Sequence, residues 1–213
     1  IKESEDSQNA CPWTFDEYDM AREELFYASL QVRKAFVLES PYIKRNLFVY
    51  EAYNNGKYTI AEKQQMFPHL FNALSVVIPV LSSTFASVGR FLKHAGNMSL
   101  GMLLIDESGQ AVPQSALGAI YRTRRAVVVG DPLQVEPVVT IPKVLIDILA
   151  DSTCVANQYK VMENSAQTFA DNINEFNGMI GERQVGCPLV VHRRCIEPMF
   201  SISNLISYDN RIC

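Results

Sequence analysis

The first third of the chain carries hydrophobic residues at helical spacing. Apolar side chains recur every three or four positions over residues 18–36, which predicts one amphipathic helix. Pro41 ends that helix, because the residue before a proline disfavours the helical conformation. A second helix is expected over about residues 43–53. A third begins with a T-x-x-E capping box at Thr59 and contains Pro68, which must interrupt or kink it.

From residue 76 onward, short apolar runs alternate with helical segments. Continuous apolar runs are typical of strands that are buried on both faces of a parallel sheet. The expected strands are residues 76–81, 102–105, 126–129 and 189–191, and the expected helices are residues 85–94, 114–121, 144–150 and 196–206. We therefore predict an α/β protein, with a helical region or insertion over residues 1–68 and a three-layer domain with a mainly parallel sheet over residues 69–213.

Composition narrows the class of protein. The 213 residues are 48% hydrophobic and 20% charged, as in an ordinary soluble globular protein. A net charge of −4 counts against a passive nucleic-acid coat, whose affinity rests on phosphate neutralisation, but allows a motor that grips nucleic acid locally. Five scattered cysteines without a CxxC pair favour a reducing compartment. We find no signal peptide and no apolar run near the ~20 residues of a membrane span, so we expect a cytoplasmic protein without a membrane partner.

Two carboxylates, Asp106 and Glu107, directly follow an apolar run that we expect to be a buried strand. Ligands of open α/β folds bind beyond the carboxyl ends of the strands. In phosphoryl transfer one carboxylate helps to hold Mg²⁺, and another can orient or deprotonate the attacking water. Asp106 suits the metal role and Glu107 the water role. Taken alone, this pattern also describes any strand that enters a polar loop.

A second polar segment follows the next apolar run, about twenty residues later. Its sequence, GDPLQ at residues 130–134, begins with Gly130, which permits a tight turn or a close backbone approach. Pro132 stiffens the loop, and the neutral amide of Gln134 could reach a terminal phosphate or the attacking water. The polar ends of two adjacent parallel strands would together make a site.

These two segments resemble the motifs of superfamily 1 helicases. The DESGQ segment (residues 106–110) resembles motif II in its DExxQ form, and the GDPLQ segment (residues 130–134) resembles motif III of the Upf-like branch. Residues 79–84, PVLSST, resemble the stretch before motif II that contacts single-stranded nucleic acid. Residues 189–195, LVVHRRC, occupy the place of motif IV, usually YRMHP. The order and rough spacing of these segments agree with those of the helicase motifs over about residues 73–208. The resemblance therefore implies that this stretch is part of the RecA-like domain 1A.

The resemblance implies a role for each matching residue of the first two motifs. Asp106 resembles the Mg²⁺ residue, and Glu107 resembles the catalytic base. Gln110 resembles the glutamine that ties the ATP state to the rest of the core. Gln134 resembles the sensor of the γ-phosphate, and Asp131 supports its loop.

Two further groups of residues take roles from the same resemblance. Arg193 matches the motif IV arginine that contacts the γ-phosphate, although the flanking residues depart from the motif and Arg194 is the alternative. Ser82, Ser83 and Thr84 carry hydroxyls that could bond a phosphodiester backbone without reading its sequence. Such clusters at strand ends are also common as helix caps.

The 213 residues contain no GxxxxGK[ST] phosphate loop. In the helicase family this loop precedes motif II and supplies backbone amides and a lysine to the phosphates of ATP. The arginine finger of domain 2A, which can be worth ~10³–10⁵ in rate, is missing too. We therefore expect a piece of a longer chain that supplies both, and we expect the isolated piece to be inactive.

The function that the resemblance implies is an ATP-dependent helicase or translocase that uses ATP and Mg²⁺ on single-stranded DNA or RNA. Two alternatives stay open. One is a degenerate helicase-like module that binds nucleic acid or a protein and never hydrolyses ATP. The other is an unrelated doubly wound domain, in which the strands before Asp106 and Asp131 need not be neighbours.

Overall fold

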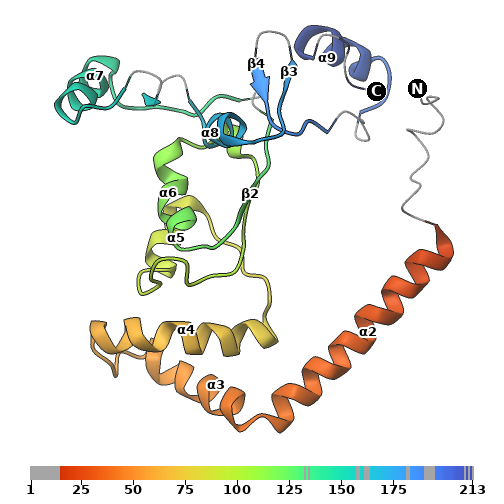
Figure 1. The fold of residues 1–213 in the computed structure, drawn as a ribbon, viewed down its shortest axis with the longest axis vertical. Coiled ribbons are helices and arrows are strands. Elements are labelled where there is room, and N and C mark those ends of the chain that lie inside the picture. The colour runs from red at the N-terminus through yellow and green to blue at the C-terminus, as the bar shows by residue number, and fades with distance from the viewer. Residues whose placement is uncertain are drawn as a thin grey trace. The chain divides into compact units, whose positions relative to one another are not determined.

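The computed structural model describes residues 15–131, 133, 135–156, 159–160, 164–180, 183–189, 195–208, 210 and 212. These residues form two units (Figure 1). One comprises the described residues up to Gly101 together with Tyr121–Arg124, and the other comprises Met102–Ile120 and the described residues from Arg125 onward. The division near residue 68 that the sequence suggests stays a prediction.

Helices make up most of the first unit. They are α2 (Asp16–Glu39), α3 (Pro41–Asn54), α4 (Ile60–Val77) and α5 (Phe85–Phe91) (Figure 1). Side chains cap two of these helices, and the capping box expected at the start of α4 is confirmed. The Ser40 hydroxyl accepts a hydrogen bond from the Ile43 amide at 3.3 Å and caps α3. At the start of α4 the Glu62 amide donates to the Thr59 hydroxyl at 3.3 Å, and the Thr59 amide donates to the Glu62 carboxylate at 2.7 Å.

Pro68 does not interrupt α4, one of the two outcomes expected from the sequence, because the helix continues to Val77. A proline inside a helix costs about 3 kcal/mol. The same helix buries Phe67, Leu70 and Phe71, each of which stabilises the fold by about 1.5–3 kcal/mol. Burial of this face therefore outweighs the cost of the proline.

The predicted strand at residues 76–81 is wrong. Residues 76 and 77 are the last turn of α4, and residues 78–84 have no regular secondary structure. A short apolar run has no period that separates a strand from a buried helix end. Here the apolar run begins inside the last turn of α4, so its first two residues are helical.

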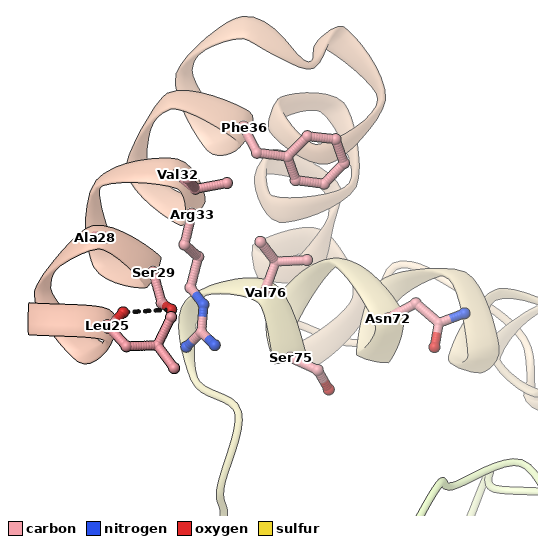
Figure 2. Close-up of a pocket in the computed structure, with 9 residues that line it drawn as sticks. All are labelled: Leu25, Ala28, Ser29, Val32, Arg33, Phe36, Asn72, Ser75 and Val76. Carbon is pink, nitrogen blue, oxygen red and sulfur yellow. Dashed lines mark hydrogen bonds between the residues drawn. The ribbon is translucent and has the colours of Figure 1, made fainter. Parts of the chain in front are cut away.

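The core of the first unit lies between α3, α4 and the segment after α5. It is formed by the buried residues Tyr53, Phe67, Leu70, Phe71, Leu92 and Ala95. The rings of Phe67 and Phe71 stack with their centroids 3.9 Å apart, and Phe91 meets the Phe71 ring edge-on at 5.9 Å. By contrast, α2 has no buried residue. Its apolar stripe, including Leu25 and Phe36, only lines an open groove beside α4 (Figure 2).

His94 is buried in this unit without a hydrogen bond. It is 8% exposed, and its ring packs edge-on against Tyr53 with the centroids 6.0 Å apart. Neither ring nitrogen has a hydrogen-bond partner among the described residues. Burial lowers the pKa of His94, and the positive charges of Lys93 and Lys63 lower it further. The fold therefore favours the neutral form of this imidazole.

This histidine predicts a pH dependence of stability. In the unfolded chain it binds a proton near its ordinary pKa of about 6.5, whereas the folded chain resists that proton. The unfolded state then binds more protons, so the free energy of unfolding should fall as the pH drops below about 6.5. Denaturant unfolding between pH 7.5 and 5.5 measures this fall. His94→Phe should remove that part of the pH dependence, and His69→Asn, at an exposed histidine, should keep it. Equal pH profiles for the His94 variant and the parent chain would contradict the assignment.

The second unit contains a parallel pair of strands, which confirms the α/β class. The strands are β1 (Leu103–Ile105) and β2 (Ala126–Val128), with Leu103 opposite Ala126 and Ile105 opposite Val128. Between them lie the short 3₁₀ helix η1 (Ser108–Gln110) and α6 (Pro113–Tyr121), so the connection is a β–α–β crossover. A sheet order in which these two strands are separated would have supported the alternative of an unrelated domain. The two strands are neighbours, so that support is not observed.

The sequence predicted strands that are buried on both faces. This prediction is wrong for β1 and β2. Leu104 is 67% exposed and its pairing partner Val127 is 44% exposed. Paired residues point to the same face of a sheet, so one face of this pair lacks a cover within the described residues.

The rest of the second unit consists of α7 (Lys143–Ser152), α8 (Ala166–Ile173), the antiparallel hairpin β3 (Gly178–Ile180) and β4 (Arg183–Val185), and α9 (Met199–Ser207). The sequence indicated α7 and α9 but not α8 or the hairpin. Helix α8 contacts η1, β2 and β4 (Figure 1). The predicted strand at residues 189–191 lies mostly outside the described residues, and Leu189 is not in a strand. No helix in the described part of the chain has the length and apolar character needed to cross a membrane.

Candidate active site

The carboxyl ends of β1 and β2 lie side by side. Backbone hydrogen bonds continue past the strands, because the Val129 amide donates to the Ile105 carbonyl at 2.8 Å and the Ser108 amide donates to the Val129 carbonyl at 3.0 Å. The DESGQ segment and the GDPLQ segment therefore leave the same edge of the parallel pair. In open α/β folds this edge is where ligands bind.

Gly130 is the point of closest approach between the two segments. A Cβ atom at Gly130 would lie 2.7 Å from the backbone nitrogen of Ser108, 2.7 Å from its Oγ and 2.8 Å from the backbone nitrogen of Gly109. Side-chain carbons do not come this close to other atoms. Of the two reasons for a glycine here, a tight turn or a close approach, the structure therefore shows the second.

Asp106 and Glu107 are both exposed at this edge. The Glu107 amide donates to Asp106 Oδ1 at 3.0 Å, and the backbone of Glu107 is left-handed, with φ 52° and ψ 38°. This conformation is uncommon for a residue other than glycine and costs of order 1–3 kcal/mol. Such strain is concentrated at functional sites, where the surrounding structure imposes it. The turn is completed by Gln110, whose amide Nε2 lies 3.3 Å from Glu107 Oε2.

The chemistry of Asp106 fits a magnesium ligand. Mg²⁺ prefers oxygen ligands and is usually bound through one or two carboxylates, with water and substrate phosphates as the others. Asp106 is exposed, and within the described residues only its Oδ1 accepts a hydrogen bond. Its second oxygen can face an ion. The described residues contain no group of three or more metal-binding side chains, so Asp106 would supply one ligand among water and phosphate oxygens.

Asp131 is held from two sides. Its Oδ1 accepts a hydrogen bond from the Leu133 amide at 2.8 Å, and its Oδ2 accepts one from the hydroxyl of Tyr208. Burial raises the pKa of Tyr208 to about 12, and the hydrogen bond to Asp131 contributes to the rise. The phenol therefore stays protonated and remains a donor at neutral pH. Sequence reasoning missed Tyr208, because no spacing rule links it to a residue so distant in the chain.

The bond from Tyr208 predicts a measurable contribution to stability. Removing one hydrogen bond to a partly exposed carboxylate costs about 1 kcal/mol. Tyr208→Phe should lower the free energy of unfolding by that amount, as measured by urea unfolding. Tyr159→Phe is the matched control, because Tyr159 is 52% exposed and its hydroxyl makes no hydrogen bond within the described residues. Equal effects of the two substitutions would mean that Tyr208 does not hold Asp131.

The remaining predicted site residues belong to the first unit or lie outside the described residues. Ser82, Ser83 and Thr84 lie in the first unit, are exposed, and precede α5. The hydroxyls of Ser83 and Thr84 lie 2.9 and 3.0 Å from the hydroxyl of Ser87. Thr84 occupies the N-cap position of α5, but its side chain makes no capping bond. Pro132, Gln134, Arg193 and Arg194 lie outside the described residues.

Comparison with known proteins gives one match. A family model described as an AAA domain matches residues 44–141, a stretch that includes both the DESGQ segment and the GDPLQ segment. The match indicates a helicase-like ATPase module. No curated protein and no solved structure is similar enough to this chain to count as a match.

Proposed function

We propose that this chain forms part of the ATPase core of an ATP-dependent helicase or translocase that acts on single-stranded DNA or RNA. The observation that carries the proposal is the junction at Gly130, where the GDPLQ segment packs directly on the backbone of the DESGQ segment. Either sequence alone is a weak signal. Together, on neighbouring parallel strands and within the stretch matched by the AAA family model, they make one site.

Each carboxylate in the DESGQ segment has its own part in the proposed reaction. Asp106 would bind the Mg²⁺ that accompanies ATP, and Glu107 would accept the proton of the water that attacks the γ-phosphorus. Bound Mg²⁺ neutralises charge on the phosphate oxygens. The amide of Gln110, 3.3 Å from Glu107 Oε2, restrains one carboxylate oxygen and leaves the other for the water. A general base of this kind contributes about 10²–10⁴ in rate.

The γ-phosphate would be contacted by Gln134 and Arg193, as the resemblance to superfamily 1 helicases implies. Asp131 supports this role, because its two hydrogen bonds hold it to Leu133 and Tyr208, and Leu133 directly precedes Gln134 in the sequence. Ser82, Ser83 and Thr84 would hold the phosphodiester backbone of the nucleic acid through their exposed hydroxyls. The lysine loop for the phosphates and domain 2A would come from the rest of a longer chain, so the 213 residues alone should not hydrolyse ATP.

Strand displacement by the complete natural protein tests this proposal. A short labelled strand is annealed to a longer DNA or RNA strand with a single-stranded overhang, and its release is followed with and without ATP. The proposal predicts release that requires ATP, Mg²⁺ and an overhang of at least one of the two nucleic acids. Tight binding of single strands without any ATP turnover would instead indicate the non-hydrolysing module.

A further inference from the structure

The DESGQ segment is tied to a later helix through a buried serine. Ser108 is fully buried, and its hydroxyl lies 2.6 Å from Gln167 Oε1 and 2.9 Å from the Val129 carbonyl. A hydroxyl has one hydrogen to donate. Because the Ser108 amide also donates to the Val129 carbonyl, that carbonyl keeps a partner when the hydroxyl turns to Gln167. Gln167 is thus the acceptor that satisfies the buried serine.

Gln167 also forms a hydrogen bond to a buried carboxylate, that of Asp171, one turn further along α8. Its Nε2 donates to Asp171 Oδ1 at 2.7 Å, and the amide of Gly186 donates to the same oxygen at 3.1 Å. Gln167 and Asp171 are 8% and 5% exposed. A buried carboxylate is costly unless it is hydrogen-bonded, so both donors matter to the fold.

The approach of Gly186 to Asp171 leaves no space for a side chain. A Cβ atom at Gly186 would lie 3.0 Å from Asp171 Oδ1 and 2.8 Å from Nδ2 of Asn174. Gly186 directly follows β4, and the chain runs on from it towards Arg193. One buried chain of hydrogen bonds therefore joins the DESGQ segment, α8 and the segment that leads to the motif IV sequence.

A glutamine suits the centre of this chain for a chemical reason. The Ser108 hydroxyl needs an acceptor, and the Asp171 carboxylate needs a donor. A side-chain amide offers both at once, whereas a carboxylate or an ammonium offers only one. The N-terminus of α8 is held independently, because the Ala166 amide donates to the Ala111 carbonyl at 2.8 Å. Substitution of Gln167 should therefore change the hydrogen-bond chain without releasing the helix.

We propose that Gln167 is a positioning residue, which fixes the DESGQ segment relative to Gly186, from which the sequence leads to Arg193. The inference rests on the proposed ATPase function, in which Glu107 and Arg193 act on the same phosphate. Gln167 contacts neither ATP nor the attacking water in the proposed reaction, and it acts through Ser108 and Asp171. A displacement of about 1 Å in a catalytic group can cost ~10²-fold in rate.

Steady-state ATP hydrolysis by the complete natural protein tests the role of Gln167. Gln167→Met keeps the length of the side chain, but removes both the acceptor for Ser108 and the donor to Asp171. We expect kcat to fall by on the order of tenfold or more, with the KM for ATP changed by less than about threefold. Gln184→Met, at an exposed glutamine of β4, is the matched control and should leave kcat unchanged.

Wild-type kcat in Gln167→Met would overturn the proposal. If Gln167→Met does not fold, Ser108→Ala, which removes the hydroxyl that reaches Gln167, takes its place, and wild-type kcat in that variant has the same meaning. The hydrogen-bond link itself is tested separately by denaturant unfolding of the 213-residue chain with Ser108→Ala and Gln167→Met, singly and together. Non-additive effects support the link, and additive effects contradict it. Absence of ATP turnover in the wild-type protein would instead refute the proposed function.

Discussion

Replacing Glu107 by glutamine in the complete protein should lower the rate of ATP hydrolysis by about 10²–10⁴-fold, because the reaction loses its general base. Glutamine has nearly the same size and keeps an oxygen that can accept the Gln110 amide, so the turn should persist. Asp106 is unchanged, so Mg²⁺-dependent binding of ATP should be retained. Single-turnover hydrolysis and equilibrium binding of ATP, measured on the same preparation, separate the two effects.

Glu136→Gln is the control for the removal of a negative charge from this region. Glu136 is exposed and lies two residues after the GDPLQ segment, and the proposed reaction does not use it. The Glu136→Gln variant should hydrolyse ATP at the wild-type rate. If Glu107→Gln keeps a rate within about threefold of wild type, Glu107 is not the base, since a base contributes far more than that.

Replacing Gly130 by alanine should destabilise the chain by about 1–3 kcal/mol, the usual cost of forcing a methyl group into a filled space. The upper end of this range is expected, because two of the three atoms within 2.8 Å of the added Cβ are backbone nitrogens, which move only with the chain. Urea unfolding of the 213-residue chain measures the loss.

Gly178→Ala is the matched control for this substitution. Gly178 begins β3 in the same unit, and a Cβ atom there would meet no atom within 4 Å. Alanine at such a site should be neutral or stabilising by about 0.4–1 kcal/mol, through the smaller entropy of the unfolded chain. Equal stabilities of the two variants would show that the segments do not touch at Gly130.

Local signals in the sequence predicted much of the fold. The capping box of Thr59 and Glu62 marks the start of α4, and Ser40 with Pro41 marks the boundary between α2 and α3. Such signals involve residues only a few positions apart, so the chain shows them directly. The neighbouring strand ends followed from a more general rule, because apolar runs joined by a helical crossover favour parallel strands that end at one edge.

The errors arose where tertiary contacts decide the outcome. The run at residues 76–81 has no period of its own, and its first two residues belong to α4, whose buried face depends on the rest of the unit. Helix α8 was missed although Ser165 and Thr168 cap it, because its apolar face is short and includes the buried polar residues Gln167 and Asp171.

The candidate site was predictable only in part, for the same reason. The roles of Asp106 and Glu107 follow from motifs that are contiguous in sequence. Their supports are remote: Gln167 is 59 residues from Ser108, and Tyr208 is 77 residues from Asp131. No spacing rule connects residues so far apart, and only the folded chain shows that they meet.

Steady-state ATP hydrolysis by the complete natural protein, with and without single-stranded DNA or RNA, tests whether Glu107 serves a nucleic-acid-stimulated ATPase. We expect Mg²⁺-dependent turnover that a single strand of at least one nucleic acid stimulates and that Glu107→Gln lowers by about 10²–10⁴-fold. Absence of turnover with both nucleic acids, or turnover that the Glu107 substitution leaves unchanged, would contradict it.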